Sequence, residues 1–92
     1  MDRRDLRRWR LRTCRGFTFA IYVLCYLAKN HCFEDGNKRA AWLALVEILA
    51  RLGLTVDASQ DEAADFVKRI AEAPSLDISL AVDWVEPRLI AL

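Results

Sequence analysis

The feature that most constrains this chain is an almost uninterrupted apolar segment, residues 17–29, followed by a short polar segment and then a second helical pattern. A helix that is apolar around most of its circumference is stable in water only when other elements enclose it. We therefore expect residues 17–29 to form the central helix of one domain. The 92 residues leave no room for a second domain. We divide the chain into a basic arm, residues 1–16, and a helical domain, residues 17–92.

A secretory signal sequence is the alternative explanation of this segment, because arginines precede it. The residues before a cleavage after Ala28 would include Tyr26, where a small residue is expected. The apolar stretch is also too short to span a bilayer. The chain has three cysteines, an odd number without metal-ligand spacing, which is typical of reduced thiols in a cytoplasmic protein. We therefore interpret the segment as a core helix and expect no membrane association.

The rest of the chain also has helical periodicity. From Lys38 the apolar residues expected on one helix face are Trp42, Leu45, Val46, Leu49 and Leu52, and Gly53 follows as a helix terminator.

A third helix is predicted after the capping box that starts at Ser59, with its buried stripe at Ala63, Phe66, Val67 and Ile70. A last helix is expected to begin near Asp77, to direct Leu80, Trp84 and Val85 inward, and to kink or end at Pro87. No segment alternates with period two over a useful length. The fold class is therefore all-α, with about four helices.

The net charge of +1 conceals an uneven distribution. Residues 1–15 hold seven arginines and two aspartates, whereas residues 16–92 hold more acids than bases. A basic arm can bind nucleic acid, but this one has a single aromatic residue, Trp9, and no base-reading module around it. We therefore favour a solvated arm over a nucleic-acid-binding one.

The polar segment between the two central helices contains the chemistry. His31 titrates near neutral pH, and Asp35 is a carboxylate suited to a hard metal that keeps several waters. Gly36 and Asn37 tolerate unusual backbone angles immediately before a helix N-terminus, where free N–H groups and the helix dipole favour anions. Two cations, Lys38 and Arg39, follow directly. These residue types within nine positions predict a site that handles phosphoryl groups.

The stretch from His31 to Arg39, His-Cys-Phe-Glu-Asp-Gly-Asn-Lys-Arg, resembles the signature of the Fic/Doc family, and most closely its Doc (death-on-curing) branch. The resemblance implies a small all-α domain with the anion-binding loop between two central helices. It implies that His31 is the general base, that Phe33 anchors the loop in the core, and that Asp35 holds Mg²⁺. The phosphates of ATP would be bound by Gly36, Asn37, Lys38 and Arg39.

The Doc branch is favoured because it has a lysine where AMP-transferring Fic proteins usually have glycine. Those proteins also have a second arginine three positions after the first, where this chain has Trp42. The resemblance therefore implies a toxin of a toxin–antitoxin pair that transfers the γ-phosphoryl group of ATP to a protein hydroxyl, as in elongation factor Tu, and so arrests translation. A Phd-type antitoxin would neutralise it.

Two other functions remain open at this point: transfer of AMP, and an inactive remnant that only binds a partner. Doc-like proteins normally have a longer region before the loop than the 30 residues here. Without the early helices of that region, apolar surface would be exposed, which predicts a homo-oligomer or dependence on a partner.

Overall fold

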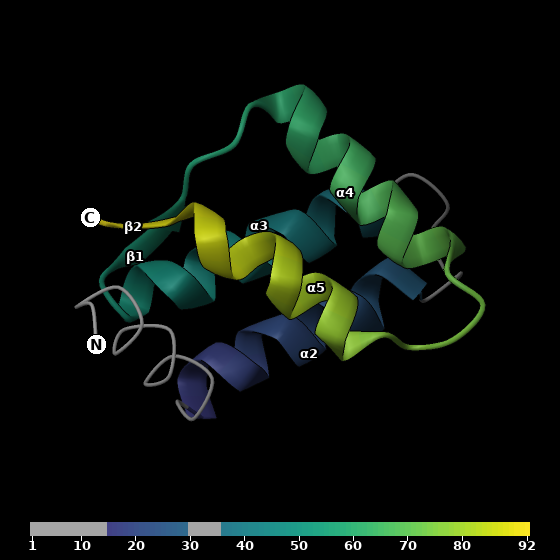
Figure 1. Cartoon of the computed structure of the whole chain (residues 1–92), viewed down its shortest axis with the longest axis horizontal. Helices are drawn as coiled ribbons and strands as arrows, with labels where there is room; N and C mark the ends of the chain where they lie inside the picture. The colour runs from purple at the N-terminus through teal and green to yellow at the C-terminus, as the bar shows by residue number, and fades with distance from the viewer. Residues whose placement is uncertain (1–14, 30–35) are drawn as a thin grey trace.

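The computed structural model describes residues 15–29 and 36–92 of the chain (Figure 1). The elements, in chain order, are α2 (Arg15–Lys29), α3 (Gly36–Arg51), β1 (Leu54–Val56), α4 (Gln60–Glu72), α5 (Ile78–Val85), the 3₁₀ turn η1 (Glu86–Arg88) and β2 (Leu89–Ala91). The described part of the chain is predominantly helical, and the expected all-α class with about four helices is confirmed.

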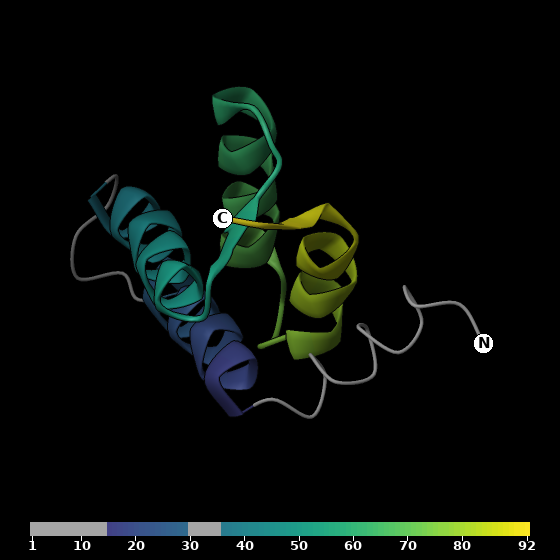
Figure 2. The ribbon, with the colours of Figure 1, turned by 90° about the vertical axis from the view of Figure 1, so that its left-hand side faces the viewer.

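The four helices form two layers. Helices α2 and α3 lie side by side in one layer, and α4 and α5 cover one face of that pair (Figures 1 and 2). The first turn of α2 lies against the end of α3, since a Cβ atom at Gly16 would be 2.9 Å from Leu52 Cδ2. The two helices of this layer are therefore antiparallel, and the six residues 30–35 connect their other ends.

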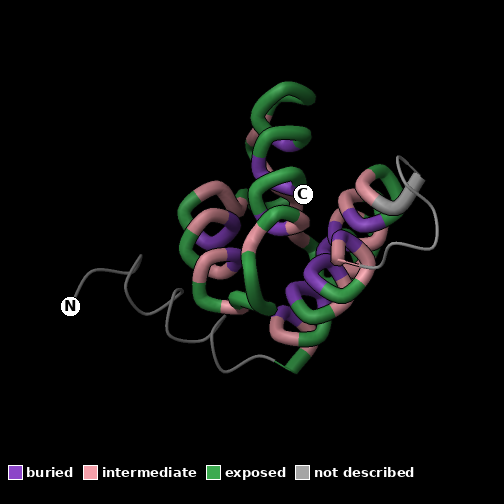
Figure 3. Tube along the Cα trace, turned by 90° about the vertical axis from the view of Figure 1, so that its right-hand side faces the viewer, coloured by how far each residue is buried: buried purple, intermediate pink, exposed green. Residues whose placement is uncertain are grey.

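Helix α2 provides the centre of the core, as the sequence predicts. Its buried residues are Phe17, Ala20, Ile21, Leu24, Cys25 and Ala28, which contact the other three helices. The expectation that α2 is enclosed on all sides is wrong, because Phe19, Tyr22 and Tyr26 are between 50% and 70% exposed. These three aromatic residues follow helical spacing and lie on the face of α2 that neither α4 nor α5 covers. Figure 3 shows the same division between buried and exposed sides of the helices.

Helix α3 contributes a narrower buried stripe than predicted. Leu45 and Leu49 are fully buried, and so is Ala41, which the predicted stripe omits. Trp42 and Val46 are half-buried. Leu52 is 40% exposed, because α3 ends at Arg51 and the chain turns away there. Gly53 adopts a φ of 78°, which confirms its predicted role in terminating the helix without a Cβ penalty.

The second layer begins with a confirmed capping box. The Ser59 hydroxyl accepts a hydrogen bond from the backbone N–H of Glu62 at 3.1 Å, and the Glu62 side chain accepts one from the Ser59 N–H. The predicted stripe of α4 is buried as expected: Ala63, Phe66, Val67 and Ile70. Asp77 caps α5 by accepting a hydrogen bond from the Leu80 N–H at 3.0 Å.

Two features near the C-terminus differ from the prediction. The α-helix α5 ends at Val85, close to Pro87 as predicted, but Glu86 retains right-handed helical angles and the chain continues into the 3₁₀ turn η1. After η1, β2 pairs with β1 in an antiparallel ladder of three residues, with Thr55 opposite Ile90. Three residues are too few to show a period of two, so periodicity could not reveal these strands.

No helix in the described ranges has both the length and the apolar character needed to cross a membrane.

Replacement of Leu45 by alanine should destabilise the domain by about 2–5 kcal/mol, because it leaves a cavity where the core has no exposure. The matched control is Leu43→Ala on the same helix, where the side chain is 65% exposed and the expected change is within about 0.5 kcal/mol. Urea unfolding followed by far-UV circular dichroism measures both. Equal losses of stability would contradict the packing of α3 against α2.

The stability of the domain should fall in alkali because of Cys25. Burial raises the pKa of this thiol to about 11, an effect that the nearby Asp77 carboxylate reinforces and Lys29 opposes. Between about pH 9 and pH 11 the unfolded chain loses the thiol proton and the folded chain keeps it, so each pH unit costs up to about 1.4 kcal/mol. The stability advantage of the wild-type protein over Cys25→Ala should therefore shrink as the pH rises through this range. A constant difference in free energy of unfolding would exclude this linkage.

Candidate functional site

The predicted site residues fall into two groups. His31, Phe33 and Asp35 lie outside the described residues, so their predicted roles remain predictions. The four predicted phosphate-binding residues form the first turn of α3: Gly36, Asn37, Lys38 and Arg39. The helix therefore begins at Gly36 and not after Asn37, two residues earlier than expected, and the predicted position of Gly36 and Asn37 before the helix is wrong.

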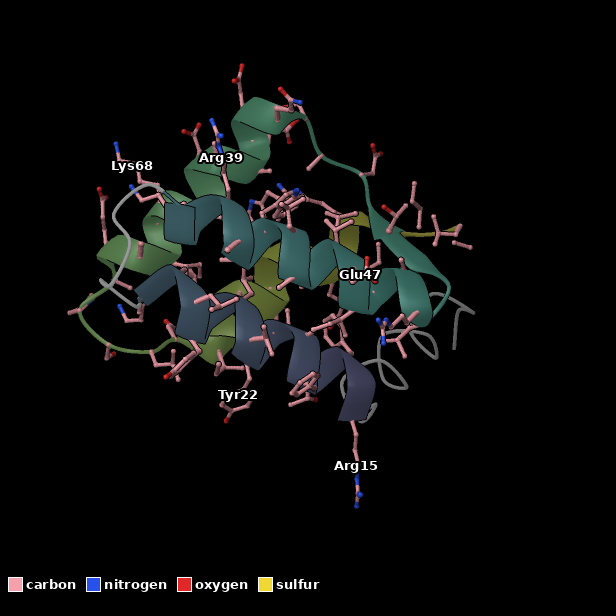
Figure 4. The ribbon with its side chains drawn as sticks, turned by 180° about the vertical axis from the view of Figure 1, so that it is seen from behind. Arg15, Tyr22, Arg39, Glu47 and Lys68 are labelled. Atoms are coloured by element: carbon pink, nitrogen blue, oxygen red, sulfur yellow. The ribbon has the colours of Figure 1, made fainter. Side chains whose placement is uncertain are left out.

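The first turn of α3 is suited to an anion. The first four backbone N–H groups of a helix have no partner within the helix, and the macrodipole places partial positive charge at the same end. This turn contains no acidic residue. Lys38 is half-buried and Arg39 is exposed, and Figure 4 places Arg39 in this part of α3. Two cations at a helix N-terminus oppose the dipole, a local cost that a bound phosphate would remove.

Helix α2 ends at Lys29, two residues before His31, and this lysine has a role that the sequence did not reveal. Its Nζ donates hydrogen bonds to the backbone carbonyls of Ile70, at 3.4 Å, and of Ala73. Both acceptors lie at the C-terminal end of α4, where carbonyl groups lack helical partners and the dipole favours a cation. The end of α2 is thereby tied to the end of α4, across 41 and 44 residues of sequence. The only signal in the sequence was a cation in the last turn of an otherwise apolar helix.

Trp42 lies one turn after Arg39 and belongs to an aromatic cluster. Its ring meets that of Trp84 edge to face, with centroids 6.2 Å apart and an interplanar angle of 79°. Phe66 stacks on Trp84 at 4.0 Å and 3°. The guanidinium carbon of Arg88 lies 4.1 Å from the centroid of the Trp84 ring, and its Nη1 donates to the Trp84 carbonyl at 2.7 Å. The side chain at position 42 is therefore committed to packing between the two layers.

Three other charged residues of α3 and α4 are exposed. Glu47 and Arg51 form an i, i+4 ion pair at 3.5 Å on α3, and Lys68 is exposed on α4 (Figure 4). Within residues 15–29 and 36–92 there is no group of three acidic, histidine or cysteine side chains that could hold a metal ion. The predicted Mg²⁺ ligand, Asp35, lies outside these ranges.

Comparison with known protein families gives a match to part of the chain. The model of the Fic/DOC family matches residues 6–49, which include all of α2, the residues that connect it to α3, and most of α3. Residues 6–49 of this chain are thus similar to the Fic/DOC family. The match begins inside the arginine-rich segment and therefore extends well before the motif from His31 to Arg39. No curated protein and no solved structure gives a significant match.

Arg39→Gln should separate phosphate binding from folding. A ligand at about ten times its Kd stabilises a protein by about 1.4 kcal/mol, so ATP with Mg²⁺ should raise the Tm of the wild-type domain by about 5 °C or more. Loss of the Arg39 charge should abolish most of that increase and leave the ligand-free Tm unchanged or slightly higher, because a cation opposes the dipole there. Arg51→Gln, at the opposite end of α3, is the control. The same increase in both variants would exclude phosphate binding by Arg39.

Proposed function

We propose that this protein is a Doc-type toxin that transfers the γ-phosphoryl group of ATP to a hydroxyl group of a protein such as elongation factor Tu, and thereby arrests translation. The observation that carries the proposal is the start of α3. There the motif glycine begins a helix whose first turn carries Lys38 and Arg39 and no acid. Similarity to the Fic/DOC family supports a nucleotide-dependent transfer in general.

The choice of phosphoryl over AMP transfer is supported by two positions. Lys38 stands where AMP-transferring Fic proteins usually have glycine. Trp42 stands where they have a second arginine, and its indole packs edge to face on Trp84 instead of offering a cation to phosphate.

In the proposed reaction the hydroxyl oxygen of the target attacks the γ-phosphorus of ATP. A new O–P bond forms, the bond from phosphorus to the β–γ bridging oxygen breaks, and ADP leaves. His31 accepts the hydroxyl proton, and base catalysis of this kind contributes about 10²–10⁴-fold. The cations and N–H groups at the start of α3 neutralise phosphate charge, which is the main requirement of phosphoryl transfer. Mg²⁺, with Asp35 as its ligand, would supply further neutralisation.

The partner implied by the resemblance is a Phd-type antitoxin. The exposed aromatic residues of α2, Phe19, Tyr22 and Tyr26, provide support for a protein partner, because Tyr and Phe are enriched at interfaces. Helix α2 contains no acidic residue and begins at the exposed Arg15 (Figure 4). An acidic amphipathic helix would complement this surface in both charge and hydrophobicity. A second copy of the chain is the alternative occupant.

Radiolabelled ATP distinguishes the two chemistries. With Mg²⁺ and elongation factor Tu, label from γ-³²P-ATP should enter the protein target, and label from α-³²P-ATP should not. His31→Ala should lower the rate by about 10²-fold or more, and Arg51→Gln should retain it.

Label from the α-phosphate would support AMP transfer in place of phosphoryl transfer. If neither nucleotide labels any protein of a cell extract, and growth arrest on overexpression does not depend on His31, the enzymatic function is excluded and a partner-binding remnant remains.

A further inference from the structure

Helix α5 packs on α2, and a groove of about 380 Å³ lies between them (Figure 1). Its lining residues are Phe17 and Thr18 in the first turn of α2 and Ile78, Ser79, Val82 and Asp83 of α5. The three apolar residues are buried or half-buried, whereas Ser79 and Asp83 are exposed. The groove therefore has an apolar floor and an acidic rim.

Glu86 continues the acidic rim along the same side of the helix. It follows Asp83 by three residues and keeps helical backbone angles, so the two residues are neighbours on the helix surface. Glu86 is 7% exposed and is the only charged side chain that is buried among the described residues. A carboxylate is stable in such surroundings when cations or hydrogen-bond donors contact it. This side of α5 therefore favours a cationic occupant.

We infer that residues 6–14 of the same chain dock in this groove, with their arginines against Asp83 and Glu86 and their apolar side chains on its floor. The segment, Leu-Arg-Arg-Trp-Arg-Leu-Arg-Thr-Cys, contains four arginines, three large apolar residues and no acid. It therefore complements the groove in both charge and hydrophobicity. The docking is independent of the transfer reaction proposed above, and for these residues it replaces the expected solvated arm by a packed one.

The point where the segment joins the fold favours the same groove. Residue 14 is followed by Arg15, the first residue of α2, and the groove residues Phe17 and Thr18 come two and three positions later. Helix α5 has eight residues and is about 12 Å long, whereas a segment of nine residues can span up to about 30 Å. The segment can therefore reach both carboxylates of the rim. The Fic/DOC match, which begins at residue 6, includes the same nine residues.

A double-mutant cycle in the full-length protein tests the contact. The groove variant carries Asp83→Asn and Glu86→Gln, and the arm variant has glutamine in place of the four arginines of the segment, Arg7, Arg8, Arg10 and Arg12. The groove substitutions should lower the Tm of the wild-type protein by about 4 °C or more. They should lower the Tm of the arm variant by less than about 2 °C, because the cationic partners are already absent there.

The control for the cycle is Asp65→Asn with Glu72→Gln, which removes the same two charges at exposed positions of α4. This substitution should change the Tm by less than about 2 °C in the wild-type protein and in the arm variant. If the groove variant does not fold, Asp83→Asn alone replaces it, because Asp83 is exposed.

Trypsin, which cleaves after arginine, gives a second readout. The segment should be cleaved about tenfold more slowly in the wild-type protein than in the groove variant, at a temperature where circular dichroism shows both folded. The control variant should match wild type. NaCl at about 1 M should remove most of the protection, since exposed charges are strongly screened at that ionic strength.

Equal losses of Tm in the wild-type and arm backgrounds would overturn the inference, and so would equal rates of cleavage in the wild-type protein and the groove variant. Protection that disappears on dilution would overturn docking within one chain and assign the groove to the segment of a second copy. Binding of the wild-type protein to a DNA duplex with a log–log salt slope of about −3.6 or steeper would overturn it as well, because four arginines would then be free to contact phosphates.

Discussion

The structure depends on the packing of α2 against the other three helices. Six of its 15 residues are buried, and through them α2 contacts α3 beside it and both helices of the second layer. Small residues matter here as much as large ones. Ala20, Ala28 and Ala41 are buried at or near full depth. A domain this small has few other apolar contacts to replace those of α2.

The same helix links stability to function. Its buried face holds the domain together, and its last turn is the point from which the motif segment leaves. Lys29 extends the core contact into hydrogen bonds with the end of α4. Helix α3 follows the motif segment, and its buried residues fix a first turn that carries Lys38 and Arg39. The cations and free N–H groups of the candidate site are thus placed by the packing of two helices whose interiors contain no catalytic group.

The candidate site is predicted from local signals of the sequence, and the structure describes only its Gly36, Asn37, Lys38 and Arg39, in the first turn of α3. A histidine, a carboxylate, a glycine and two cations within nine residues indicate phosphate chemistry without knowledge of the fold. Lys29 escaped prediction because its partners, Ile70 and Ala73, are more than 40 residues away and are backbone carbonyls, which no side-chain pattern reveals. The edge-to-face contact of Trp42 with Trp84 could not be predicted either, because its partner is also distant in the sequence.

By itself the sequence determined the all-α class, the capped start of α4 and the termination of α3 before Gly53. Helical period, capping and the positive φ of a glycine depend on neighbours in the chain. Only the tertiary structure decided which apolar side chains are covered. Phe19, Tyr22 and Tyr26 belong to the same apolar segment as the buried residues between them, yet their side chains are exposed. The physical reason is geometric: α3, α4 and α5 all pack on the remaining sides of α2, and burial depends on neighbours in space that hydrophobicity alone does not identify.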